Sequence, residues 1–222
     1  MLIGSNMAFM AGGGGPVTIS LTDHAVDSSD SATYTFTSRA IGTASSGRKI
    51  VVGIARNSGG AAGAVSSVTI GGISATKITG VNYVSESSAE LWQADVPTGT
   101  TATIVVVWAN SGLRMGIGVW ALTNAAASAH DAQTASNGAP GMSVSINCPA
   151  NGAVLGCASN GGASTWTWTG IAEQYDEGTE GGVRYQSGAS SAFATQQTGL
   201  SVTASDGSGG SVTMAVCSFG PA

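Results

Sequence analysis

The sequence predicts an all-β protein, and three observations favour this class. Short runs rich in Val, Ile, Thr and aromatic residues recur along the chain between Gly, Ser, Asn and Pro, a pattern typical of strands joined by turns. No segment of about twelve residues holds a capped helical apolar period, and the nearest, Asn124–Gln133, is an Ala-rich connector. Apolar residues make up 42% of the chain and charged residues 9%. This balance is opposite to that of disordered chains, so the protein should fold.

The expected strands form two series. The first series consists of Val17–Leu21, Thr33–Thr37, Lys49–Arg56, Val65–Ile70, Ser74–Thr79, Ala89–Ala94, Ala102–Trp108 and Met115–Leu122. The second consists of Met142–Asn147, Ala153–Ala158, Thr165–Thr169, Ile171–Tyr175, Gly182–Ser187, Leu200–Ala204 and Ser211–Phe219.

The second series matches the first as a diverged copy. Three pairs of segments align in the same order: KIVVGIARNSGG (Lys49–Gly60) with AVLGCASNGG (Ala153–Gly162), VTIGGISATK (Val68–Lys77) with WTWTGIAEQY (Trp166–Tyr175), and GIGVWAL (Gly116–Leu122) with TMAVCSF (Thr213–Phe219). The first alignment places Gly53 on Gly156. The repeat halves should therefore cover about residues 33–123 and 142–220.

Two Greek-key-like halves in one chain predict a jelly-roll-like antiparallel β-sandwich over residues 16–222. The link Asn124–Gly141 is short and holds no rigid proline spacer, which favours one sandwich. Two tandem Ig-like sandwiches are the alternative, because each half is just large enough to fold alone.

The N-terminal segment MLIGSNMAFMAGGGG has no charged n-region and does not resemble a secretory signal. We expect residues 1–15 to form a docking arm on a glycine hinge. Its apolar side chains would fill a pocket or add a strand to a neighbour; they are Leu2, Ile3, Met7, Phe9 and Met10.

Charge and hydropathy exclude two kinds of partner. The net charge is −5, and the seven Lys and Arg residues are scattered along the chain, so no basic stripe is available for nucleic acid. No apolar run approaches the roughly 18 residues of a membrane span.

The three cysteines, Cys148, Cys157 and Cys217, form no C-x-x-C motif or Cys/His cluster. We expect them to be buried free thiols, consistent with folding in a reducing cytoplasm, and we expect no metal or other cofactor.

The sequence gives no sign of catalysis. His24 and His130 stand in loop-like segments, and no G-x-S-x-G motif supplies a nucleophile on a strained turn. The glycine pairs lack a phosphate-loop pattern and suit hairpin turns. We therefore expect a protein that is not an enzyme.

Two acidic clusters, DHAVDSSD and EQYDEGTE, are expected to be solvated turns first and ligand contacts second. Four residues of the second cluster and a tyrosine just after it could form a glycan-contacting edge: Tyr175, Asp176, Glu177, Glu180 and Tyr185. Trp166 and Trp168 alternate on one strand face and align with Val68 and Ile70, so we expect them to fill the core.

Four stretches carry a resemblance to a known group of proteins: YTFTSRAIGTASSGRKIVVGIA, SVTIGGISATKI, LWQADVPTGTTATIVVVW and GIGVWALTN. Together with WTWTGIAEQYDEG, they resemble β-sandwich virion structural proteins of tailed bacteriophages, over a span from near Tyr34 to Phe219. The resemblance implies capsid decoration, head-fibre or tail-tip and fibre subunits. Such subunits are homo-oligomers on a capsid or tail, and some of them touch host surface glycans.

The leading expectation is a virion protein that is made in the host cytoplasm, bound to phage capsid or tail proteins, and active by assembly and host-surface adhesion. The alternative is a carbohydrate-binding module of an adhesin or tail fibre.

Overall fold

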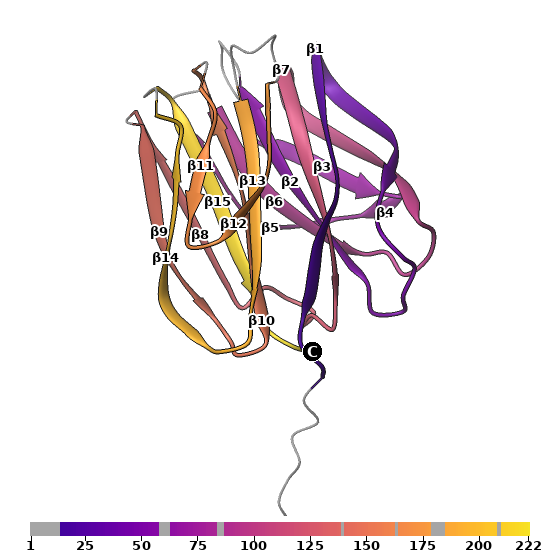
Figure 1. Ribbon diagram of the computed structural model, residues 1–222. Coiled ribbons are helices and arrows are strands. Elements are labelled where there is room, and N and C mark those ends of the chain that lie inside the picture. Colours follow the sequence, from indigo (N-terminus) through magenta and orange to yellow (C-terminus); the bar gives the residue numbers. More distant parts are fainter. Residues whose placement is uncertain are drawn as a thin grey trace, which may run out of the picture.

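The computed structural model describes residues 14–57, 63–83, 87–138, 140–162, 164–178, 185–207 and 210–222, apart from the side chains of residues 57, 111–113 and 185. These residues form antiparallel strands and turns (Figure 1). The strands are β1 (Thr18–Ala40), β2 (Lys49–Asn57), β3 (Val65–Ile70), β4 (Ile73–Ser74), β5 (Thr76–Tyr83), β6 (Ser87–Asp95), β7 (Thr101–Thr123), β8 (Asp131–Asn137), β9 (Gly141–Cys148), β10 (Gly152–Asn160), β11 (Thr167–Thr169), β12 (Ala172–Gly178), β13 (Tyr185–Phe193), β14 (Gln197–Ser205) and β15 (Val212–Phe219). The antiparallel β-sandwich class predicted from the sequence is confirmed.

The first half of the chain builds two layers from one sheet, because β1 and β7 each run through both layers. The later part of β1 and the earlier part of β7 lie beside β3 and β4, whereas their other parts pair in a layer with β2, β6 and β5. Register shifts accompany the change of layer in β1, and Arg114 of β7 has a positive φ of 42° near the corresponding bend. Bulges and such backbone conformations bend a strand sharply. The sequence suggested two separate strands in each of these stretches, and the structure joins them.

The second half repeats this arrangement with separate strands. One sheet has the order β12-β13-β10-β15-β8, and a smaller sheet has the order β11-β14-β9. The turn that follows β3 and the turn that follows β11 each hold a glycine at positive φ, Gly72 at 80° and Gly170 at 88°. Glycine adopts this conformation without steric cost. These two glycines are the pair that the sequence alignment matched.

Three hydrophobic clusters fill the spaces between the layers. The first lies inside the first half and includes Ile54, Ile104 and Trp108. The second lies inside the second half and includes Trp166 and Trp168, so the expectation that these two rings fill the core is confirmed. The third is shared between the halves. The layers thus correspond to the alternative with one sandwich per half, the two being joined face to face.

The shared cluster explains the composition of the inner sheets. Its side chains come from both halves: Val51, Leu91, Trp120 and Leu122 from the first, with Leu155, Cys157, Tyr175, Cys217 and Phe219 from the second. Every residue of β10 and of β15 is buried. Strands that are covered on both faces become continuous apolar or small-residue runs rather than alternating ones.

Both ends of the described chain lie at one end of the molecule (Figure 1). The Gly14 N–H donates a hydrogen bond to the Ala222 carbonyl oxygen at 3.3 Å, and the Val17 N–H donates to Asn151 O at 2.9 Å. The two residues at the hinge of the predicted arm, Gly14 and Gly15, therefore lie against the sandwich. Residues 1–13, which include Leu2, Ile3, Met7, Phe9 and Met10, lie outside the described residues.

Candidate functional site

The acidic edge around β12 differs from the glycan-contacting edge that the sequence suggested. Tyr175 is only 6% exposed and belongs to the cluster shared between the halves. Its ring stacks on His24 with 5.0 Å between centroids and an interplanar angle of 1°, and it lies 6.1 Å from the Trp120 ring. The expectation that Tyr175 presents its ring to a ligand is wrong, because β1 and its histidine cover that ring.

Glycines provide the space for this ring. A Cβ atom on Gly188 would lie 2.3 Å from the Tyr175 ring, and one on Gly118 would lie 2.6 Å from its Oη. Contacts this short exclude any larger side chain at either position. Tyr175 is therefore a structural residue that fills the edge of the interface between the halves.

The neighbouring carboxylates also make internal contacts. Glu177 Oε1 lies 2.9 Å from His24 Nδ1, and Asp176 Oδ2 accepts a hydrogen bond of 2.7 Å from the backbone N–H of Trp166. Burial raises the pKa of Asp176 to about 6; the Trp166 hydrogen bond opposes the shift, and repulsion from Glu173 adds to it. Glu180 lies outside the described residues, as does the side chain of Tyr185.

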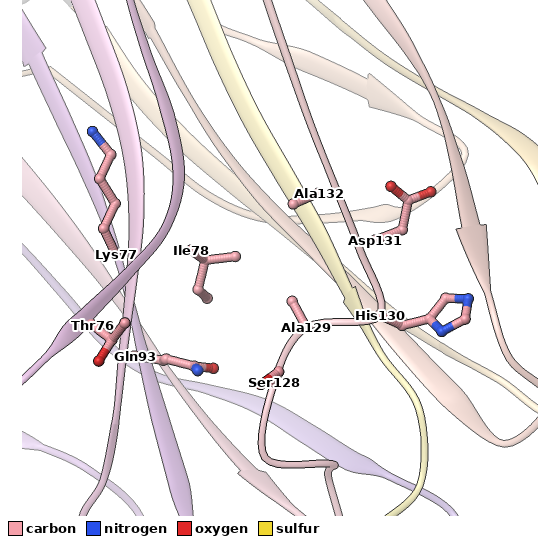
Figure 2. Close-up of a pocket in the computed structure, with 9 residues that line it drawn as sticks. All are labelled: Thr76, Lys77, Ile78, Gln93, Ser128, Ala129, His130, Asp131 and Ala132. Carbon is pink, nitrogen blue, oxygen red and sulfur yellow. The ribbon is translucent and has the colours of Figure 1, made fainter.

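The opposite edge of the interface holds an open groove that the sequence did not suggest. Here β5 forms the edge of its sheet, and the connection between β7 and β8 passes beside it. A hollow of about 400 Å³ is lined by Thr76, Lys77, Ile78, Gln93, Ser128, Ala129, His130, Asp131 and Ala132 (Figure 2). A second hollow of about 350 Å³ shares Thr76 and Gln93 with the first and extends to Lys49, Ile73, Ser74, Ala94, Asp95 and Ala127. We call these two hollows together the β5 groove.

The floor and walls of the β5 groove differ in polarity. Ile78, Ala129 and Ala132 pack partly against the cluster shared between the halves and form an apolar floor. Figure 2 shows the Gln93 side chain extending toward Ser128, whereas His130 points away from the space. Gln93 Nε2 donates a hydrogen bond of 3.2 Å to Ala127 O, which fixes the orientation of its amide. Gln93 Oε1 is buried and accepts no hydrogen bond from the described residues.

Charged side chains around the groove have partners within the protein. Lys77 Nζ lies 3.0 Å from Glu90 Oε2, and Lys49 Nζ lies 2.6 Å from Asp95 Oδ1. Asp131 accepts hydrogen bonds from Gln133 and from the backbone and side chain of Asn147. Burial alone would raise the pKa of Asp131, but these hydrogen bonds outweigh it and leave the pKa below its usual value. The groove therefore presents paired charges and neutral polar groups.

Within the described parts of the chain, no group of three or more His, Cys, Asp or Glu residues is placed to hold a metal ion. His24 contacts Tyr175 and Glu177, and His130 lies beside Asp131 at the rim of the β5 groove. The described residues include no helix that is long and apolar enough to cross a membrane. The three cysteines are free and buried, as the sequence predicted.

The sequence offered little signal for the groove because its residues come from three separate segments. Thr76 and Ile78 lie on β5, Gln93 lies on β6, and Ser128 and Ala129 lie in the stretch that the sequence marked only as a connector. Each of these residue types is common in this chain. Only the packing of one half on the other brings them together.

Comparison with known proteins gives faint similarities. No family model matches the chain, and no curated protein matches it. A solved structure named as that of the PBSX exported protein XepA is 9% identical, with 90% of this chain and 86% of that chain covered, at a TM-score of 0.24. An anti-sigma factor domain-containing protein is 8% identical, with 84% and 77% covered, at a TM-score of 0.22.

Proposed function

We propose that this chain is a structural protein of a tailed-phage virion. It is displayed on the capsid or tail surface and acts by assembly and host-surface adhesion, without catalysis. The observation that carries the proposal is that both described ends of the chain lie at the same end of the molecule. Its two described ends meet through the hydrogen bond between Gly14 and Ala222 at one end of the sandwich layers. A subunit that docks through its N-terminal arm at this end would project its other end outward.

The docking end also offers a hollow for an apolar group. This hollow, of about 300 Å³, is lined by Pro16, Val17, Asn151, Gly152, Ala192, Phe193 and Ala194. It adjoins the point where residues 1–13 leave the described body. A neighbouring subunit at the base of a projecting protein would find apolar surface here.

The far end carries the described ends of several strands. The last residues of β2, β5, β10 and β12 lie there, together with the bends of β1 and β7 (Figure 1). Connections on a rigid scaffold are the segments that proteins most often use for contact with other molecules. This placement supports display of the far end toward a host surface.

The body itself has a bland surface. Of the charged residues in the described part of the chain, five are buried: Arg48, Lys49, Arg56, Glu90 and Asp206. Among the described residues, the large apolar side chains that are exposed are Val26 at 37% and Ile73 at 41%, on different strands. Two isolated side chains do not make a docking patch. We therefore assign docking to the arm, with the apolar residues Leu2, Ile3, Met7, Phe9 and Met10.

The proposal is tested by removing residues 1–13, a deletion that leaves the hydrogen bond of Gly14 and the contacts of Val17 in place. The truncated protein should keep its folded circular-dichroism spectrum and unfolding midpoint, and lose binding to phage particles that lack this subunit. Phe9→Ser with Met10→Ser should weaken binding at least tenfold, whereas the matched control Ser5→Ala with Asn6→Ala should not. Undiminished binding by the truncated protein would contradict docking through the arm.

Cryo-electron microscopy of the particle with bound protein gives an independent test. We expect density for this chain on the outer surface of the capsid or tail, as a homo-oligomer, with the Gly14–Ala222 end toward the particle. Density inside the particle, or attachment through the far end, would overturn the proposal.

A second candidate function is carbohydrate binding. The acidic edge no longer supports it well, because Tyr175 is buried and Asp176 and Glu177 make internal contacts. The β5 groove supports it better.

A further inference from the structure

We propose that the β5 groove is a binding site for a neutral saccharide chain, with Gln93 at its centre. The inference goes beyond the proposed assembly role and does not depend on it, because it concerns other residues than those of the arm and can be tested on the purified protein. Three features carry it: an acceptor without a donor, an apolar floor between neutral polar walls, and charges that are already compensated.

The Gln93 amide is half satisfied. Its Nε2 donates to Ala127 O at 3.2 Å, so the amide cannot turn over without losing that bond. Its Oε1 is buried and has no donor among the described residues. A buried acceptor is costly unless a donor reaches it. A hydroxyl group bound in the groove would supply that donor.

The shape and polarity of the groove suit a pyranose ring. Ile78, Ala129 and Ala132 form a floor for the C–H face of a sugar. The hydroxyl groups of Thr76 and Ser128 stand at the walls, where sugar hydroxyls can exchange hydrogen bonds with them. Sites for small molecules combine an apolar lining with a few polar groups that fix orientation, and this groove has that composition.

The charges at the rim favour a neutral ligand. The Lys77 ammonium is held by Glu90, and the Lys49 ammonium by Asp95. The carboxylate of Asp131 accepts hydrogen bonds from Gln133 and Asn147. A phosphate, sulfate or carboxylate ligand would have to displace one of these internal partners. A neutral saccharide leaves all of them in place.

The two hollows favour a chain over a single ring. Their volumes of about 400 and 350 Å³ lie in the lower part of the range for small-molecule sites. Both hollows are lined by Thr76 and Gln93, so Gln93 stands where they join. A ligand with one ring in each hollow would cross this residue and meet Gln93 Oε1 at its linkage region.

The test uses the full chain labelled with ¹⁵N and a panel of neutral trisaccharides built from glucose, galactose, mannose, rhamnose, N-acetylglucosamine and N-acetylgalactosamine. Each is added at about 10 mM, which detects millimolar binding. At least one should shift the Gln93 side-chain amide and the backbone amides of Ser128 and Ala129 in a saturable manner. The amides around Tyr175 should not move.

Two variants and one control decide whether the groove is responsible. Gln93→Met keeps the size of the side chain and removes its acceptor, and Ala129→Leu fills the floor. Each should weaken binding of the responding saccharide at least tenfold while the rest of the spectrum keeps its folded dispersion. Gln174→Met lies on the edge strand β12, where the amide donates to the carbonyl oxygens of Ala172 and Glu173, and it should leave binding unchanged.

Three results would overturn the inference. The first is an absence of groove shifts with every trisaccharide of the panel. The second is binding that Gln93→Met and Ala129→Leu leave intact. The third is a stronger groove response to sialyllactose, to a sulfated trisaccharide or to an extended neutral peptide than to any neutral saccharide, because it would assign the groove to another ligand class.

Discussion

Cys157 of β10 packs directly over Gly53 of β2, so that a Cβ atom on Gly53 would lie 2.9 Å from the Cβ of Cys157. The Trp120 ring occupies the remaining space, with its Cζ3 also 2.9 Å from that position. This contact lies in the cluster shared between the halves, where the inner sheets meet. The absence of a side chain at residue 53 is what allows the two sheets to approach at this point.

Gly53→Ala should therefore separate the inner sheets locally and lower the free energy of unfolding by about 1–3 kcal/mol, the usual cost of overpacking a core. Urea denaturation measures the change. Gly47→Ala is the matched control, because a Cβ there meets nothing within 4 Å, and it should leave stability unchanged or slightly raised. Equal stability of the two variants would contradict the close contact across the interface.

Tyr175 gives a prediction that separates packing from ligand binding. Its ring fills the interface, but its Oη is buried without a hydrogen-bond partner among the described residues. Removing an unsatisfied hydroxyl costs little. The free energy of unfolding of Tyr175→Phe should therefore lie within about 1 kcal/mol of the wild-type value or above it. Tyr175→Ala should cost about 3–5 kcal/mol. A marked loss of stability in Tyr175→Phe would show that the hydroxyl has a partner.

The repeat shows how far sequence matching reaches in this fold. Matching letters placed Gly53 on Gly156, but the two residues face different clusters, since a Cβ on Gly156 would approach Trp168 and Val216 of the second cluster. In the sheets themselves, Val51 of β2 pairs with Trp120 of β7, and Leu155 of β10 pairs with Cys217 of β15. The alignment of Trp120 with Cys217 therefore makes Leu155 the counterpart of Val51. This register makes Cys157 the counterpart of Gly53. A slip of one residue in a strand exchanges its faces, and glycine identity cannot detect it.

Other elements were predictable to different extents. The strands with central apolar runs, such as β2 and β10, appear where the sequence placed them, because local pattern and burial agree there. Strand β13, with the sequence YQSGASSAF, extends beyond the range expected for it. Its small residues are typical of a loop. A small residue is needed at position 188 because the Trp120 and Tyr175 rings lie against Gly188. In the same way, the burial of Tyr175 and the β5 groove arise only when the halves pack together.

The Arg48 side chain links the turn before β2 to the segment after β6 by hydrogen bonds. It is 1% exposed, and its guanidinium donates to three carbonyl oxygens, those of Val96 at 2.8 Å and of Gly42 and Thr98 at 2.7 Å each. Arg48→Met would leave these three acceptors without their donors, and we expect a loss of about 1–3 kcal/mol in the free energy of unfolding.

Arg39→Met is the control for Arg48, because Arg39 is partly exposed and its ion pair with Asp23 spans 3.8 Å. Such a pair contributes about 0–1 kcal/mol, so this variant should resemble the wild type in the same denaturation experiment. A small effect of Arg48→Met would mean that water reaches the three carbonyl groups.

The thiols should be inert in the folded protein. Burial raises the pKa of Cys148 to about 11 and that of Cys157 to about 12, and Cys217 is buried beside Cys157 in the shared cluster. Because the thiolate is the reactive form, Ellman's reagent at pH 8 should find no rapidly reacting thiol before unfolding and all three afterwards. One thiol that reacts rapidly and stoichiometrically in the native protein would contradict the packing of the halves.

The pH dependence of stability should carry the signature of Asp176. Its pKa is raised to about 6 in the folded protein, whereas an unfolded aspartate has a pKa of about 3.9. Between these values the folded state binds more protons than the unfolded state, so the contribution of Asp176 to the free energy of unfolding falls as the pH rises from about 4 to about 6. Asp176→Asn keeps an acceptor for the backbone N–H of Trp166 and does not ionise. Its stability relative to the wild type should increase from pH 4 to pH 7 in paired urea denaturation series.

Asp131→Asn provides the contrast for Asp176, because hydrogen bonds from Asn147 and Gln133 lower the pKa of Asp131. The stabilising effect of that carboxylate is fully present above its unfolded pKa, so the deficit of Asp131→Asn should be constant from about pH 5 upward. A constant difference for Asp176→Asn as well would mean that its carboxylate is solvated. A titration of the Asp176 carboxyl carbon by ¹³C NMR, with a midpoint near pH 6, would identify burial as the cause.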